Sequence, residues 1–113
     1  MTDQVANSDV KQRRFARYSF IAAAEVISLE TDTRLSSQTS ELGMGGCYVD
    51  TLNPFPEGTL VRVRIVKDNG SFESSAKVVY VLPGFGMGLA FTEVPHDEQR
   101  RMLEKWIAEL TKT

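Results

Sequence analysis

The stretch that decides the fold reads Leu60-Val61-Arg62-Val63-Arg64-Ile65-Val66, followed by Lys67-Asp68-Asn69-Gly70. Apolar residues alternate with arginines along its first half, and this period of two is typical of a strand with one buried and one solvated face. The Asn-Gly pair favours the type I′ turn of a β-hairpin. The stretch therefore predicts an antiparallel hairpin whose second strand runs over residues 72–82, through Ala76, Val78 and Tyr80.

Four more extended segments surround this hairpin. Residues 18–29 alternate between Phe20, Ala22, Ala24, Val26 and Ile21, Ala23, Glu25, Ile27. Their three alanines leave a helix open, but the β-branched and aromatic neighbours and the lack of a helix cap favour a strand. A polar strand is predicted over 35–42 and a short one over 47–49. The last covers 85–91, where two glycines indicate a bend or close packing.

The final segment has a different period. Between Asp97 and Lys112 the apolar residues recur at helical spacing along one face. These residues are Met102, Leu103, Trp106, Ile107 and Leu110. The sequence therefore predicts an all-β fold, a small barrel or sandwich of six short antiparallel strands, with one C-terminal α-helix.

Composition excludes several classes of function. The chain has 113 residues, enough for one domain, and a net charge of −2, which disfavours broad binding to nucleic acid or anionic membranes. A single cysteine, Cys47, rules out an intrachain disulfide and a cysteine metal cluster, and is expected to be an inert core residue. One histidine, His96, without a nucleophile–base pair in view predicts no enzyme and no cofactor.

The ends of the chain suggest where the protein works. Residues 1–10 have few apolar side chains and are expected to form a flexible leader, with the domain over 11–113. The leader lacks the apolar core of a signal peptide, and no apolar run approaches the ~20 residues that span a bilayer. We expect a cytoplasmic protein with no membrane insertion.

Two short motifs carry the functional signal. The first is Arg13-Arg14-Phe15-Ala16-Arg17, with three arginines in five residues just before the first strand. Arginine can grip phosphate with two parallel hydrogen bonds and can stack on a nucleobase. The second is Glu41-Leu42-Gly43-Met44-Gly45-Gly46, whose glycines permit a close approach to the backbone.

Both motifs, in this order around these strands, resemble the PilZ family of bacterial cyclic di-GMP receptors. The resemblance covers about residues 11–110 and implies a six-stranded antiparallel PilZ-type β-barrel with a C-terminal α-helix. It also implies that Arg13 and Arg17 grip the phosphates and guanines of the ligand, with electrostatic help from Arg14. The ligand would be cyclic di-GMP, with no further cofactor.

The second motif departs from the family pattern Asp/Asn-x-Ser-x-x-Gly. In the favoured register Glu41 replaces Asp/Asn, Gly43 replaces Ser, and Gly46 matches. A second register matches Ser40 and Gly43 but shifts the next strand by three residues. A lost neutral hydrogen bond costs about 0.5–1.5 kcal/mol, so weakened binding is expected rather than complete loss.

Two functions follow from the resemblance. The first is a receptor that converts binding of cyclic di-GMP into a protein–protein signal controlling motility, adhesion or exopolysaccharide output, through an unidentified protein partner. The alternative is an adaptor that keeps the fold, does not bind the nucleotide and acts through protein contacts alone. A single-strand nucleic-acid-binding barrel would need a basic groove interleaved with aromatic residues, which this acidic chain lacks.

Overall fold

The computed structural model describes residues 16–68, 70–94 and 97–112. The expected leader at 1–10 and the predicted site residues Arg13 and Arg14 lie outside these ranges, as does His96.

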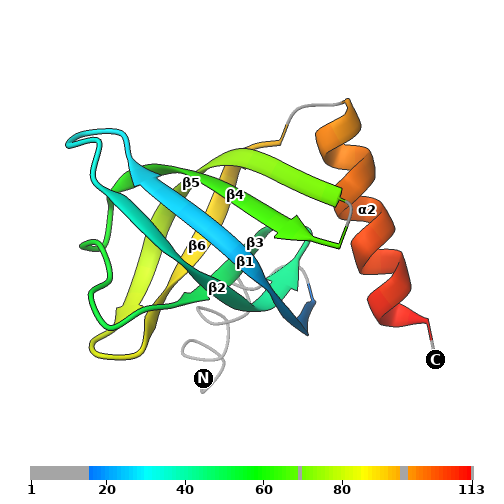
Figure 1. Cartoon of the computed structure of the whole chain (residues 1–113), viewed down its shortest axis with the longest axis horizontal. Helices are drawn as coiled ribbons and strands as arrows, with labels where there is room; N and C mark the ends of the chain where they lie inside the picture. The colour runs from blue at the N-terminus through cyan, green and yellow to red at the C-terminus, as the bar shows by residue number, and fades with distance from the viewer. Residues whose placement is uncertain (1–15, 69, 95–96, 113) are drawn as a thin grey trace, which may run out of the picture.

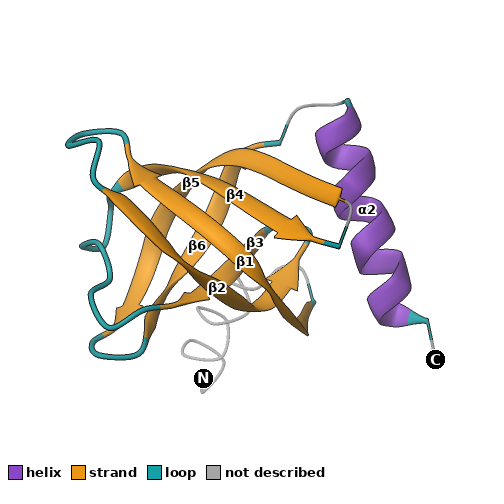
Figure 2. Cartoon of the chain, in the orientation of Figure 1, coloured by secondary structure: helices purple, strands orange, loops and turns teal. Residues whose placement is uncertain are grey.

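The described ranges contain every strand and the helix that the sequence predicts. The elements are β1 (Arg17–Ser28), β2 (Arg34–Gly43), β3 (Gly46–Asp50), β4 (Leu60–Lys67), β5 (Gly70–Leu82), β6 (Gly86–Glu93) and α2 (Glu98–Thr111). The strands form a closed barrel in the order β1-β2-β3-β6-β5-β4, and every neighbouring pair is antiparallel (Figures 1 and 2). The expected six-stranded barrel with a C-terminal helix is therefore confirmed.

Alternation fills the barrel as predicted. On β1, Phe20, Ala22, Ala24 and Val26 are buried, whereas Ile21 between them is 61% exposed. The alanine-rich segment is thus a strand and not a helix, because the pleat points every second side chain into a shared core. The same core holds three apolar residues of β4, namely Val61, Val63 and Ile65, and the arginines between them point to solvent.

The helix α2 lies at one end of the barrel, beside the β4–β5 hairpin (Figure 1). Its Leu103 and Trp106 are buried, and the ring centroids of Trp106 and of Phe20 on β1 lie 5.2 Å apart. Asp97 caps the helix by accepting a hydrogen bond from the backbone N–H of Gln99 at 2.8 Å. The apolar stripe predicted from the spacing therefore packs on the barrel itself.

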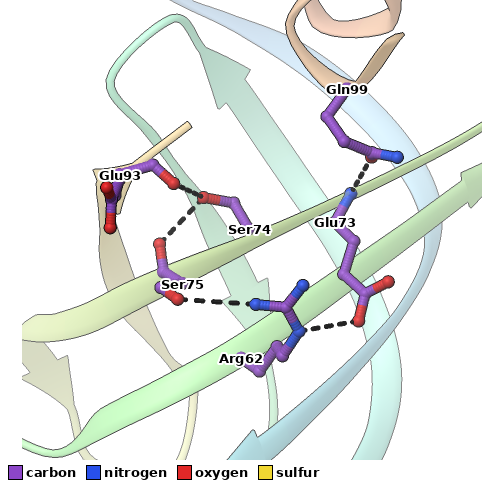
Figure 3. A network of polar contacts seen from close by, with 6 residues as sticks. All are labelled: Arg62, Glu73, Ser74, Ser75, Glu93 and Gln99. Carbon is purple, nitrogen blue, oxygen red and sulfur yellow. Dashed lines mark hydrogen bonds and ion pairs between the residues drawn. The ribbon is translucent and has the colours of Figure 1, made fainter. Parts of the chain in front are cut away.

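A polar network ties the start of α2 to the sheet (Figure 3). The side-chain oxygen of Gln99 accepts from the backbone N–H of Glu73 at 2.7 Å, and the carboxylate of Glu73 pairs with Arg62 at 2.9 Å. Beside it, the hydroxyl of Ser74 donates to the carbonyl oxygen of Glu93 at 3.2 Å. Arg62 therefore serves a surface ion pair, in agreement with its predicted solvated role.

Candidate functional site

Two rows of directly opposed residues cross the outer face of the barrel, over β2, β3, β6 and β5. One row consists of Glu41, Tyr48, Gly88 and Tyr80. The next consists of Gln38, Asp50, Gly86 and Leu82. Neighbouring residues on β3 and β6, such as Val49 and Met87, are fully buried, so the rows face outward. Side chains of β2, β3 and β5 and the bare backbone of two β6 glycines thus meet on one surface.

Glycine on β6 lets two tyrosine rings lie on this surface. A Cβ on Gly88 would collide with the ring of Tyr80, and a Cβ on Gly86 would come 2.6 Å from the hydroxyl oxygen of Tyr48. The two rings therefore cover bare backbone, with centroids 6.1 Å apart and planes 26° from parallel. The close packing that the glycines predicted is confirmed: the two tyrosine rings pack directly against the backbone of β6.

The tyrosines line an open hollow of about 650 Å³. It is bounded by residues of β2, β3, β5 and the β5–β6 turn, namely Ser40, Glu41, Tyr48, Asp50, Tyr80, Leu82, Gly84 and Phe85. At the rim Phe85 is 74% exposed. The volume lies within the range of small-molecule sites, and aromatic surface combined with a few polar groups is typical of them.

The positively charged side chain of Arg17 lies beside the hollow. The side chain of Arg17, at the start of β1, is only 9% exposed. Its guanidinium donates to the hydroxyl of Tyr80 at 3.3 Å and lies 3.8 Å from the carboxylate of Glu41. Arg17 therefore reaches over the outer face to the hollow, where two of the lining residues already engage it.

Acidic groups determine the charge inside the hollow. Glu41 and Asp50 both line it, and the amide of Gln38 donates to one oxygen of Asp50 at 3.3 Å. The pKa of Tyr48 is raised, first by burial and then by the nearby Tyr80, Asp50 and Glu41, which disfavour a phenolate. Tyr48 therefore stays a neutral ring with a hydroxyl at physiological pH.

Two predicted site residues, Gly43 and Gly46, do not line the hollow. A Cβ on Gly43 would collide with the carbonyl oxygen of Ala16, and one on Gly46 would collide with that of Leu89. Both glycines let neighbouring backbone approach closely at the β2–β3 hairpin. The absent side chain of Gly43 thus allows β1 to approach β2 next to Arg17, and that of Gly46 allows β3 to approach β6.

The structure brings together only some of the predicted site residues. Arg17 and Glu41 meet at the hollow, whereas Arg13 and Arg14 lie outside the described residues. The sequence reasoning missed Tyr48 and Asp50, although alternation about the buried Val49 could have placed both on the outer face.

Tyr80 reaches the outer face through an irregularity of β5. Alternation through Ala76 and Val78 would direct its side chain to the core, but the register shifts between Val78 and Tyr80. This irregularity adds a residue to one strand, so Tyr80 lies on the outer face over Gly88. Local sequence gave no signal for the shift.

Cys47 has no part in the site. It is fully buried, and burial raises the pKa of its thiol from 9.0 to about 12, with the nearby Arg17 charge opposing the shift. A thiol of that pKa is unreactive at neutral pH, as expected.

Within the described residues, no three His, Cys, Asp or Glu side chains converge on a point where a metal ion could bind. No described helix has the length and apolarity needed to cross a membrane.

Comparison with known proteins decides the fold family. No family model and no curated protein matches the chain at the level of sequence. Solved structures do match. The PilZ domain of CeSA from a cellulose-synthesizing bacterium has a TM-score of 0.66 at 20% identity, with 86% of this chain and 99% of that one covered. The protein has the PilZ-domain fold.

Two further PilZ-fold matches broaden the comparison. The PilZ domain of YcgR from Escherichia coli, described with c-di-GMP, has a TM-score of 0.68 at 19% identity and covers 88% of this chain and 91% of that one. The Bacillus subtilis inhibitor of motility MotI/DgrA has a TM-score of 0.68 at 18% identity, with 86% of this chain and 50% of that one covered. The chain thus spans nearly all of the isolated PilZ domains and half of the longer regulator.

These descriptions name domains and regulators and no enzyme, in agreement with the expectation that the PilZ-fold chain is not an enzyme. At identities of 20% and below, the likeness is one of fold.

Proposed function

We propose that the protein is a receptor for cyclic di-GMP that converts binding of this second messenger into a contact with another protein. The supporting observation is that Arg17, from the first motif, and Glu41, from the second, meet at a hollow of ligand size. Two solved structures of the same fold are described as YcgR from Escherichia coli with c-di-GMP, which makes this ligand the first to test.

Charge balance explains why the whole first motif belongs to the proposed site. Cyclic di-GMP carries two phosphates, but the hollow itself holds the carboxylates of Glu41 and Asp50. Arg17 alone would leave the site net negative, and a dianion would be repelled. With Arg13 and Arg14 the arginines outnumber the carboxylates, so the proposal requires the first motif to close on the ligand.

The proposed role of the second motif differs from that in the family. Glu41 stands in the position of the family's Asp/Asn, and its contact with Arg17 has to be exchanged for a phosphate when the ligand binds. Gly43 and Gly46 contribute close strand packing rather than side-chain contacts. The ligand would favour the state in which all three arginines face it.

The proposed output is a change of surface at the rim. Leu82 and Phe85 border the hollow and are exposed, so a bound nucleotide would alter the surface that a partner protein meets. The processes expected are motility, adhesion or exopolysaccharide output in a bacterial cytoplasm. Among the PilZ-fold matches, one is described as an inhibitor of motility and another as a c-di-GMP-dependent transcription regulatory factor.

The adaptor without nucleotide binding is the second candidate. Its supporting observation is the engagement of Arg17 by both Glu41 and Tyr80, which reduces the positive charge offered to a phosphate. In the adaptor, the carboxylate of Glu41 would occupy Arg17 permanently, in place of a ligand phosphate. The same experiment separates the two candidates.

Calorimetric titration of the purified protein with cyclic di-GMP is the deciding test, with GMP at the same micromolar concentrations as the control ligand. The receptor predicts saturable binding that is lost in Arg13→Ala and in Arg17→Ala. Arg64→Ala, an exposed arginine on β4, is the matched control and should bind as the wild type does. A folded protein that gives no heat at high micromolar ligand would be the adaptor, and its partner would then be sought by pull-down.

A further inference from the structure

Tyr48 and Tyr80 together form an aromatic floor on the barrel. Each ring covers a glycine of β6, and the planes lie only 26° from parallel. One side of each ring rests on backbone while the two residues border the open hollow. A planar group can stack on an aromatic surface of this kind, and every nucleobase can stack on tyrosine because every base has an aromatic face.

We infer that this floor is the stacking platform for one guanine base, and that Asp50, not Glu41, reads the edge of that base. The identity of the ligand rests on the proposed function, but the platform is a claim about these three residues. None of them belongs to the two motifs that suggested the receptor.

The position of Asp50 suits this role. It follows Tyr48 by two residues on β3, so both side chains stand on the same face, and both line the hollow. Gln38 donates to Oδ2 of Asp50 at 3.3 Å, which orients the carboxylate. Its other oxygen makes no hydrogen bond with any residue in the described ranges.

Glu41 is less suited to reading a base. Its carboxylate lies 3.8 Å from the guanidinium of Arg17, so a cation already engages it before any base is bound. When a ligand phosphate binds Arg17, the carboxylate of Glu41 is a negative charge beside that phosphate and repels it. Asp50 has no such competing cation among the described ion pairs.

The chemistry of the base gives the selectivity. The Watson–Crick edge of guanine presents two adjacent donors, N1–H and the N2 amino group, which a carboxylate accepts together. Adenine presents an acceptor at N1, which a carboxylate repels. The platform should therefore accept either purine by stacking but retain guanine through Asp50.

Nuclear magnetic resonance of the tyrosine rings tests the platform directly. The chain has three tyrosines, and Tyr18 does not line the hollow, so its signals are an internal control. With millimolar GMP as the probe, we expect ring-current shifts of Tyr48 and Tyr80 and none of Tyr18. AMP at the same concentration should cause much smaller shifts. Equal shifts of all three tyrosines, or none, would overturn the platform.

Variants then separate stacking from edge reading. Tyr48→Phe keeps the ring and should keep the GMP response, whereas Tyr48→Leu should weaken binding about tenfold or more, the usual loss for one stacked base. Gly88→Ala retains both tyrosines but adds a Cβ where the Tyr80 ring lies, so it should act like Tyr48→Leu. A Tyr48→Leu protein with an unchanged response would contradict the inference.

Asp50→Asn tests whether Asp50 recognises the edge of the base. The carboxamide nearly preserves shape and can pair with adenine, so the preference for GMP over AMP should fall about tenfold or more. Asp68→Asn, in the β4–β5 turn beside α2, is the matched control and should keep the preference. Unchanged selectivity in Asp50→Asn would show that another group reads the base.

The platform and the receptor fail in different experiments. If cyclic di-GMP gives no heat but GMP still shifts Tyr48 and Tyr80, the receptor is refuted while the platform stands. If cyclic di-GMP binds but Tyr48→Leu and Asp50→Asn leave affinity and selectivity unchanged, the receptor stands and the platform is refuted.

Discussion

The guanidinium of Arg17 lies 3.8 Å from the carboxylate of Glu41, across the boundary between β1 and β2. The arginine side chain is 9% exposed and the glutamate 42%, so the pair is neither fully buried nor freely solvated. This contact joins the two sequence motifs. It also places a negative charge next to the cation on which anion binding depends.

Glu41→Gln should therefore strengthen binding of cyclic di-GMP. Removing a competing ion pair of this kind gains about 0.2–1 kcal/mol, or up to about fivefold in affinity. Titration calorimetry measures the change. Glu73→Gln, which breaks the exposed Arg62 pair at 2.9 Å, is the matched control and should leave the affinity unchanged. Weaker binding by Glu41→Gln would mean that Glu41 itself holds the ligand.

Gly43→Ser restores the family's serine but should destabilise the protein. A Cβ at this position collides with the backbone carbonyl of Ala16, and backbone yields less readily than a side-chain end. We expect a loss of about 1–3 kcal/mol in the free energy of unfolding, as in other overpacked sites. Urea denaturation followed by circular dichroism checks this. Unchanged stability would show that β1 can move away from the hairpin.

Cys47 should make the protein less stable in alkali. Its pKa is 9.0 in the unfolded chain and about 12 in the barrel, because burial disfavours the thiolate. Between these values the unfolded chain releases the proton and the folded chain keeps it, so the free energy of unfolding falls as pH rises. Below pH 9 this contribution is fully present.

Comparison of the wild type with Cys47→Ala isolates this effect from other groups that titrate in alkali. Substitution adds a constant offset for lost packing, but the alkaline fall should be shallower in the variant. Denaturant midpoints measured at several pH values above neutrality provide the test. Parallel curves for the two proteins would mean that the thiol ionises equally in both states.

Trp106→Ala should detach α2 from the barrel. The indole is 5% exposed and packs against Phe20, and loss of a buried tryptophan typically costs about 3–5 kcal/mol. Trp106→Phe, which retains an aromatic ring beside Phe20, should lose much less. Thermal unfolding followed by circular dichroism distinguishes them. Similar melting of both variants would indicate that Leu103 alone anchors the helix.

Much of the fold could be read from local pattern. The alternation of β4, the Asn-Gly turn and the helical spacing around Leu103 and Trp106 each predicted the element found. These signals are local because one face of each element must be apolar, and its period is dictated by backbone geometry. The candidate site was harder, since Arg17 and Glu41 alone meet at the hollow among the predicted residues that the structure describes.

The sequence by itself determined which segments become strands, that arginines occupy the solvated side of residues 60–66, and that arginines adjoin a glycine-bearing hairpin. Tertiary structure alone decided the surface that these strands share. Pairing of β3 with β6 and of β6 with β5 sets Gly88 between Tyr48 and Tyr80, and a register shift turns Tyr80 outward. Such pairings join residues far apart in the chain, so no local period records them.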